Sequence, residues 1–222
     1  MVNKETTPKR DSKTAIFEAA AQEFAERGFD AAGVDRIAAA AGVNKAMLYY
    51  HFGNKQALYR ELLRGTFSRV ATALQALVEE GGSAEEVLDR MIATIARVAE
   101  AHPFLPAVML REIAEGGTHL DRDTMAAMAG LPRAFASVIG KGVQAGTMRP
   151  LNPLIAYFST VAPIMLFTAS APIRKEMAGT QQLPFAMPER EAFITHVQHM
   201  LRRSLAADGR DTQAPAATSS PR

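Results

Sequence analysis

The sequence predicts an all-α protein, because its apolar residues recur three and four positions apart and no stretch alternates apolar with polar residues as a strand would. Glycine, serine and asparagine residues interrupt this pattern at intervals that suit the ends of helices. About nine helices are expected. They are arranged as a domain of three short helices near the N-terminus, followed by a larger C-terminal helical bundle.

These patterns divide the chain into four parts. Residues 1–11 are expected to form a flexible basic arm, and residues 12–56 a first domain of short helices. Residues 57–207 form the helical bundle. The remaining residues, 208–222, read DGRDTQAPAATSSPR and are polar and rich in proline, serine and alanine, so they are expected to be disordered.

The composition excludes several classes of protein. The 222 residues include no cysteine, which excludes a disulfide framework, thiolate metal sites and a cysteine nucleophile, and suits a cytoplasmic protein. The first residues, MVNKETTPKRDSK, lack the apolar run of a signal peptide. The formal net charge of +2 permits nucleic-acid binding without indicating it, since residues 1–64 hold ten Lys and Arg against eight Asp and Glu.

The first helix is expected to begin at Ser12, a good N-cap residue, and to end at Gly28. Between them Ile16, Ala20 and Phe24 fall on one face of the helix and form its apolar stripe. This helix is therefore expected to cover the helices that follow it in the chain.

A second, short helix is expected from Val34 to Ala41, because its apolar residues are spaced i, i+3, i+4 and i+7, and Gly42 ends it. Asn44 and Asn54 are suitable N-caps for a third and a long fourth helix, and the glycines after residue 80 end the fourth. Five further helices are expected at 84–101, 103–115, 121–145, 153–171 and 188–207.

One segment, Leu154 to Ile173, contains no charged residue and is long enough to span a bilayer. Polar residues and Pro163 interrupt it, and amphipathic helices precede and follow it, which argues against a membrane span. A helix that is apolar on all sides is otherwise one that packs between its own domain and a partner subunit. We therefore expect no membrane association.

The stretch from Val34 to Phe52, VDRIAAAAGVNKAMLYYHF, has the features of a helix-turn-helix. Gly42 lies where the turn needs a positive φ, and Val43 fills the space between the two helices. The small side chain of Ala38 allows the helices to cross closely. A generic helical hairpin would share this spacing, so the spacing alone leaves both interpretations open.

The outward-facing residues of the second helix of this motif favour DNA binding. They combine hydrogen-bond donors, methyl groups and aromatic rings, which suit the major groove of DNA. These residues are Lys45, Ala46, Met47, Tyr49, Tyr50 and His51.

The run GVNKAMLYYHFGNKQALYREL resembles the signature of the TetR (tetracycline-repressor) family of transcriptional regulators, over about residues 10–64. The resemblance implies a domain that binds double-stranded operator DNA. Tyr49 and Lys55 would contact phosphates, Lys55 with help from the backbone amides that begin the fourth helix. Tyr50 and His51 would reach either the DNA backbone or a base. Three residues would face bases: Lys45, Ala46 and Met47.

The sequence departs from the family pattern at two positions. Many relatives have a hydroxyl residue that caps the second helix and touches a phosphate, whereas this chain has Gly33, which offers only its backbone N–H. A threonine is common in the recognition helix, whereas this chain has Met47, which packs on a thymine methyl but donates no hydrogen bond. The operator sequence therefore cannot be taken from relatives.

The segments HPFLPAVMLREIAEGGTHLD, GTMRPLNP and FTASAPIR resemble one branch of the same family, often linked to export of foreign compounds. By that resemblance the C-terminal bundle binds a small effector, about whose chemistry the resemblance says little. The effector is expected to be largely apolar because the bundle is rich in methionine and phenylalanine. The C-terminal bundle would also form a homodimer through its last two helices, 153–171 and 188–207, as a four-helix bundle. The chain is then expected to be a ligand-responsive repressor that the effector releases from its operator.

Flexible methionines and aromatic rings suit a permissive apolar cavity, although for each such residue taken singly ordinary core packing is the more common role. Glu112, in an apolar stretch, could either orient a polar group of the effector or lie on an exposed helix face. The apolar candidates are Phe104, Met109, Met125, Phe135, Phe158 and Met165.

No metal or cofactor is expected. His196 and His199 are spaced i, i+3 on one helix, but no glutamate precedes a histidine by three residues and no carboxylates accompany this pair. Two other classes of protein are alternatives to a regulator. A small helical enzyme would need a nucleophile, a base and an orienting group, and the sequence contains no nucleophile elbow or P-loop. A non-sequence-specific DNA-binding protein would need more positive charge than +2.

Overall fold

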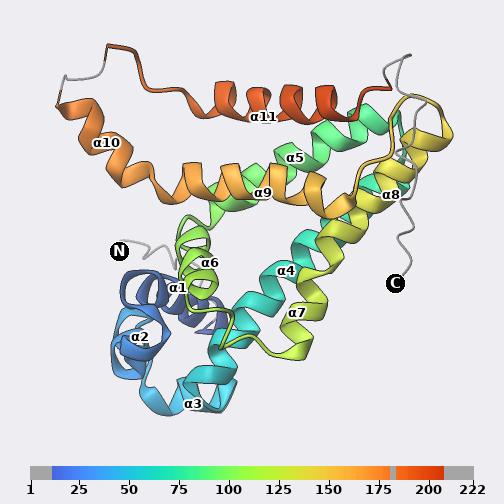
Figure 1. Ribbon diagram of the computed structural model, residues 1–222. Helices are drawn as coiled ribbons and strands as arrows, with labels where there is room; N and C mark the ends of the chain where they lie inside the picture. Colours follow the sequence, from blue (N-terminus) through green and yellow to red (C-terminus); the bar gives the residue numbers. More distant parts are fainter. Residues whose placement is uncertain (1–11, 181–183, 208–222) are drawn as a thin grey trace, which may run out of the picture.

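The computed structural model describes residues 12–180 and 184–207, and these residues form eleven α-helices (Figure 1). The all-α fold class is confirmed. The expected arm (1–11) and tail (208–222) lie outside the described residues. The helices are α1 (Ser12–Ala31), α2 (Val34–Ala40), α3 (Lys45–Phe52), α4 (Lys55–Glu80), α5 (Ala84–Ala101), α6 (Phe104–Ala114), α7 (Arg122–Met128), α8 (Gly130–Gln144), α9 (Pro153–Ala169), α10 (Ala171–Gly179) and α11 (Arg190–Leu205).

Two of these helices were not expected separately. The predicted helix 121–145 is divided at Ala129 into α7 and α8, because Pro132 lacks the N–H that would continue the hydrogen-bond ladder back to Met128. The other, α10, follows α9 after a bend of 54°. A proline in the first turn of α10 fits this new start.

The close crossing of α8 with α4 depends on Gly130. A Cβ atom at this position would lie 2.6 Å from the Cβ of Ala71 on α4, which is closer than two such atoms approach in proteins. The absence of a side chain therefore allows the start of α8 to pack directly against α4.

The N-terminal core is formed by α1, α2 and α3 but is completed by helices outside residues 12–56. Ile16 and Phe24 of α1 and Leu48 of α3 are fully or almost fully buried. Leu58 and Tyr59 of α4, and further along the chain residues of α6, belong to the same cluster. Figure 1 shows α6 lying against α1 and α4 leading away from this cluster. The DNA-reading unit expected from the sequence thus shares its core with the rest of the chain.

The larger core joins α4, α5, α8, α9 and α11. Phe135 on α8, Met91 on α5 and Leu205 on α11 are each fully buried in it. Burying a side chain of this size contributes about 1.5–3 kcal/mol. In Figure 1, α9 and α11 lie side by side across one end of this core, and both pack against α5.

The uncharged run has two distinct faces in the structure. Ile164 is only 2% exposed and packs in the larger core, as does Ala156. The opposite face of α9 is exposed, with Phe158 at 59% and Leu166 at 62%. Among the described residues no single helix is long and apolar enough to cross a membrane, and α9 with α10 meet the length and composition criteria only as a bent pair.

Candidate nucleic-acid interface

The turn between α2 and α3 is built by three residues in succession. Gly42 adopts a φ of 67°, which a side chain would disfavour. The Val43 N–H then donates to the carbonyl of Ala38 over 3.0 Å. Asn44 caps α3, because its Oδ1 accepts from the N–H of Met47 over 2.7 Å. The predicted helix-turn-helix is therefore present.

One face of α3 is buried and the other is open. Leu48 is fully buried, and the ring of Phe52 packs against that of Phe17 with centroids 5.0 Å apart. Tyr50 is 86% exposed, and His51 is half-buried beside it. The other exposed candidates are Lys45, Ala46, Met47 and Tyr49. Figure 1 places α3 at the edge of the molecule, with these residues on a single short helix.

Lys45 is held in place by an acidic neighbour that sequence reasoning missed. Its Nζ lies 2.9 Å from Oδ1 of Asp35 on α2, and both side chains are exposed. The hydrogen bond with Asp35 raises the pKa of Lys45 above its ordinary value. A DNA group that approached this ammonium would meet a carboxylate already bound to it.

Gly33 already uses the N–H that was expected to meet a phosphate. This group donates over 3.0 Å to Oε1 of Glu23, which also accepts from Nε of Arg36 over 2.6 Å. Burial raises the pKa of Glu23, but these two hydrogen bonds and the charges of Arg36 and Arg27 outweigh it, so the pKa lies below its ordinary value. Gly33 is thus part of an anchor between α1 and α2 in this structure. A charged residue on the apolar face of α1, next to Phe24, was the signal for it.

The N–H donors of Lys55 also have acceptors within the protein already. An ammonium group has three N–H donors, and Nζ of Lys55 donates to the carbonyls of Phe29 (2.8 Å), Asp30 (3.1 Å) and Ala32 (3.2 Å). The same Nζ lies 4.6 Å from the centroid of the Phe29 ring. Lys55 therefore ties the end of α1 to the start of α4, and a phosphate contact would require one of these bonds to be exchanged.

The apolar candidates for the effector site do not come together in one cavity. Met109 and Phe135 are buried in different cores, and Met165 packs between the two. Met125 is 52% exposed and Phe158 belongs to the open face of α9. Methionine and phenylalanine content predicted an apolar interior but could not distinguish core, surface and cavity.

Phe104 is the exception, because it lines a groove of about 1090 Å³. Phe17 and Gln22 on α1 line one side of this α1–α4 groove, and Leu62 on α4 lines the other. The start of α6, with Phe104, closes one end. The α1–α4 groove thus lies between the helix that supports α3 and the helices of the larger core. A smaller groove of about 250 Å³ lies among α5, α9, α10 and α11.

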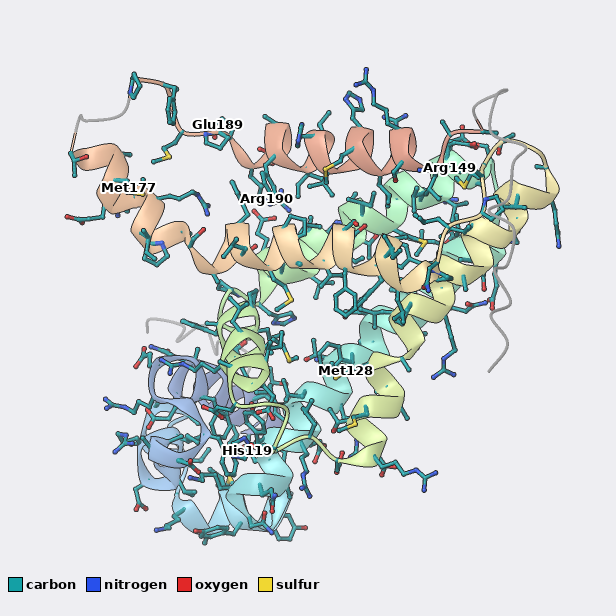
Figure 2. All side chains as sticks on the ribbon, in the orientation of Figure 1. His119, Met128, Arg149, Met177, Glu189 and Arg190 are labelled. Atoms are coloured by element: carbon teal, nitrogen blue, oxygen red, sulfur yellow. The ribbon has the colours of Figure 1, made fainter. Side chains whose placement is uncertain are left out.

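Glu112 is neither on an exposed face nor among the residues that line the α1–α4 groove. It is 1% exposed, and its Oε2 accepts from the hydroxyl of Tyr59 over 2.7 Å. Its Oε1 accepts from the backbone N–H of His119 over 2.9 Å. Burial and the hydrogen bond to Glu112 raise the pKa of Tyr59, so this hydroxyl keeps its proton and acts as the donor. Figure 2 places His119 beside the N-terminal helices, where α1, α4 and α6 meet.

Two sequence profiles match the chain in succession. The profile described as "Bacterial regulatory proteins, tetR family" matches residues 16–62, and the one described as "Tetracyclin repressor-like, C-terminal domain" matches residues 82–210. The repressor KstR2 of Rhodococcus jostii is 30% identical over 109 residues. This match covers 49% of this chain and about half, 53%, of the relative.

Solved structures share the fold over a longer range. FadR of Bacillus halodurans, a regulator of fatty acid degradation, superimposes with a TM-score of 0.69 at 20% identity and covers 88% of this chain and 97% of its own. FadR of Bacillus subtilis, solved in complex with stearoyl-CoA, gives a TM-score of 0.66 at 18% identity and covers 86% and 98%. Together with the helix-turn-helix and the two profile matches, which span both parts of the chain, these findings establish that the chain belongs to the TetR family of bacterial transcriptional regulators.

Proposed function

We propose that the chain represses transcription in the cytoplasm by binding operator DNA through α3, and that a small, largely apolar effector releases it. The observation that carries this proposal is the surface of α3, a helix capped by Asn44 and anchored by Leu48 whose open side combines one ammonium group, a thioether and two tyrosines. Such a helix fits a major groove, where donors and apolar groups can meet base edges.

The proposed roles within this surface follow from where each residue lies. Lys45, Ala46 and Met47, on the first turn of α3, face the bases, since the N-terminal residues of a recognition helix enter the groove. Tyr49 contacts a phosphate. Tyr50 and His51, at the far end of α3, reach either the backbone or a base.

Lys55 and Gly33 have a proposed supporting role as well. Their donors hold α1 against α4 and α2 in the structure. A phosphate that approaches either residue would replace a carbonyl or the Glu23 carboxylate as acceptor. We therefore rank their contribution to orientation of the domain above their contribution to affinity.

We propose that two copies associate through α9 and α11. The exposed face of α9 carries apolar residues at intervals of four, namely Leu154, Phe158, Ala162 and Leu166. The three large ones, Leu154, Phe158 and Leu166, are each at least 50% exposed. Met200 on α11 is 44% exposed. An apolar area of this kind indicates an interface in a folded protein. A dimer would also supply two recognition helices, because one helix reads too few base pairs for specificity.

The proposed effector site is the α1–α4 groove. A molecule bound there would touch α1 and the turn after α2 on one side and α4 with the end of α5 and the start of α6 on the other, so it would act on the relative position of these helices. Release then follows from a changed separation of the two recognition helices, which must match adjacent major grooves about 34 Å apart. The fatty acyl ligand of the B. subtilis structure supports an apolar effector by analogy of fold.

Footprinting with the full chain on DNA upstream of its own gene tests the DNA-binding proposal. A protected, near-palindromic site is expected, with Met47→Ala relaxing the preference at one base pair in each half-site. Protection that is equal on all sequences, or a site bound as tightly by a monomer, would refute it.

A second experiment tests the effector site. Fatty acids, acyl-CoAs and cationic drugs are screened for release of the protein from that DNA. Phe104→Ala should weaken the response to an active compound, whereas Met125→Ala, which lies outside both grooves, should leave it unchanged. By linkage, operator DNA must weaken binding of the compound by the same factor, and equal affinity with and without DNA would contradict the mechanism.

A further inference from the structure

Three potential metal ligands come together where α1, α4 and α6 meet. Nδ1 of His119 lies 3.1 Å from Oε2 of Glu112 and 3.4 Å from Oε2 of Glu115. All three donor atoms lie within 4.8 Å of one another. The sequence predicted no metal site, because no glutamate precedes a histidine by three residues, whereas here the spacings are seven and four.

The chain achieves this arrangement by reversing just after α6. Gly116 and Gly117 have φ values of 76° and 78°, a conformation that residues with side chains rarely adopt. The reversal returns His119 to the side of Glu112, on the last turn of α6. Two glycines in succession followed by a histidine were the signal in the sequence.

The separations suit a bound cation. Bonds of about 2.0–2.1 Å from a tetrahedral zinc ion place neighbouring donor atoms about 3.4 Å apart. The two distances to Nδ1 are close to this value. One imidazole with two carboxylates is also a ligand set that zinc and cobalt accept, with a further position left for water or another group.

The surroundings orient two of the three ligands, Glu112 and His119, before any ion binds. Tyr59 donates to the liganding oxygen of Glu112, and the His119 backbone N–H fixes the other oxygen. Nε2 of His119 lies 4.0 Å from the carboxylate of Asp30, and its ring packs against that of Phe29 at a tilt of 38°, with centroids 4.2 Å apart. Metal-binding histidines usually donate the second ring N–H to a carboxylate, and Asp30 lies close to this nitrogen but beyond hydrogen-bond distance.

The charge at this point is also unbalanced. Glu112 is 1% exposed, and within the described part of the chain His119 is the only basic side chain at ion-pair distance from it. Arg60 lies close by but donates to the carbonyl of His119 and pairs with Asp121. Two carboxylates share one imidazole, and burying such charge without a counterion is costly.

We propose that Glu112, Glu115 and His119 form a binding site for a divalent transition-metal ion of the zinc or cobalt type. The ion would link α6 and the loop after it, and through Tyr59 and Asp30 would hold α4 and the end of α1 in their present arrangement. The site is separate from the α1–α4 groove and from α3, so it does not depend on the proposed effector.

Cobalt binding to the full chain without DNA tests this proposal. The reference protein carries His196→Ala and His199→Ala, which removes the exposed histidine pair of α11 as a competing site. Titration with Co²⁺ is expected to produce visible absorption bands with one ion bound per chain, and Zn²⁺ should abolish them. Zn²⁺ should also raise the Tm of the reference protein.

Two variants then identify the ligands. Glu115→Gln changes an exposed side chain and is expected to weaken Co²⁺ binding by about tenfold or more, since loss of an outer partner alone costs about 10–100-fold. Tyr59→Phe should weaken it by about tenfold while circular dichroism shows a folded protein. Glu176→Gln, an exposed carboxylate on α10, should leave the affinity unchanged.

The competing explanation is that Glu112 and His119 form only a hydrogen-bonded structural contact. In that case the reference protein would give no Co²⁺ bands, or Glu115→Gln would bind Co²⁺ as tightly as the reference. Either result overturns the proposal, and neither affects the test of operator binding, which uses DNA and α3 variants.

Discussion

Nζ of Lys45 on α3 donates to Oδ2 of Asp35 on α2 over 3.0 Å, so the recognition helix presents its ammonium group with a carboxylate already bound. Any phosphate or base that binds Lys45 must displace this carboxylate or share the ammonium with it. The ion pair is exposed on both sides, so water and salt screen it.

Asp35→Asn should therefore strengthen DNA binding. Removing one negative charge beside the groove-facing helix is expected to raise operator affinity by about threefold to tenfold at low salt, and the gain should shrink as salt is raised. Fluorescence anisotropy over a salt series measures this. Asp123→Asn, an exposed carboxylate on α7, serves as the control and should change affinity little. A weaker complex for Asp35→Asn would show that Asp35 positions Lys45 rather than competing for it.

Lys55→Ala is expected to lower the stability of the fold, whereas Met47→Ala is expected to affect only DNA binding. Lys55 donates to three backbone carbonyls, so its loss is expected to lower the free energy of unfolding by about 2 kcal/mol, together with DNA affinity. Met47→Ala should leave unfolding unchanged and cost about 1 kcal/mol of binding at one base pair. Urea unfolding and anisotropy on matched operators separate the two. Equal unfolding curves for wild type and Lys55→Ala would contradict the anchoring role.

Substitutions on the two faces of α9 should have opposite consequences. Phe158→Glu places a charge on the exposed face and is expected to give a folded monomer. Ile164→Glu buries an unpaired charge in the larger core and should destabilise the fold by more than about 3 kcal/mol. Analytical ultracentrifugation with circular dichroism distinguishes these outcomes. A dimer that survives Phe158→Glu would place the interface elsewhere.

The Glu23 anchor predicts a specific dependence of stability on pH. The pKa of Glu23 in the folded chain is below its ordinary value of 4.5, so the unfolded chain binds this proton more tightly. Its contribution is therefore fully present above about pH 5 and is lost as the pH falls through the folded-state pKa. Glu23→Gln should flatten the stability curve below about pH 5 in denaturant unfolding at several pH values. An unchanged slope in this window would mean that Glu23 does not hold its proton differently in the two states.

The helix-turn-helix could be predicted because its constraints are local. A positive φ at Gly42, the cap at Asn44 and the spacing of buried residues around Leu48 each follow from neighbouring sequence. The exposed residues of α3 could also be predicted, because residues of a short helix that are not on its buried face must lie on its exposed face. Their roles on DNA remain predictions.

Contacts between residues far apart in the chain could not be predicted from the sequence. Glu23 is recognisable as a charged residue on the apolar face of α1, but the sequence does not indicate that it accepts from the Gly33 N–H ten residues later. Nor does it indicate that backbone carbonyls at the end of α1 accept from the ammonium group of Lys55. The same holds for the effector candidates. Met109 and Phe135 have the composition of a cavity wall, but only the arrangement of helices decides that both are core residues.

The contact between Gly130 and Ala71 also constrains how the molecule can move. With no space for even a methyl group between α4 and α8, these helices cannot roll over one another without separating. If α4 rotates, α7 and α8 are therefore expected to rotate with it as one rigid body. The pivot would lie at the opposite end of α4, where Tyr59 and Lys55 attach it to α6 and α1. A bulky residue at position 130 would thus uncouple α8 from α4 while leaving α1, α2 and α3 intact.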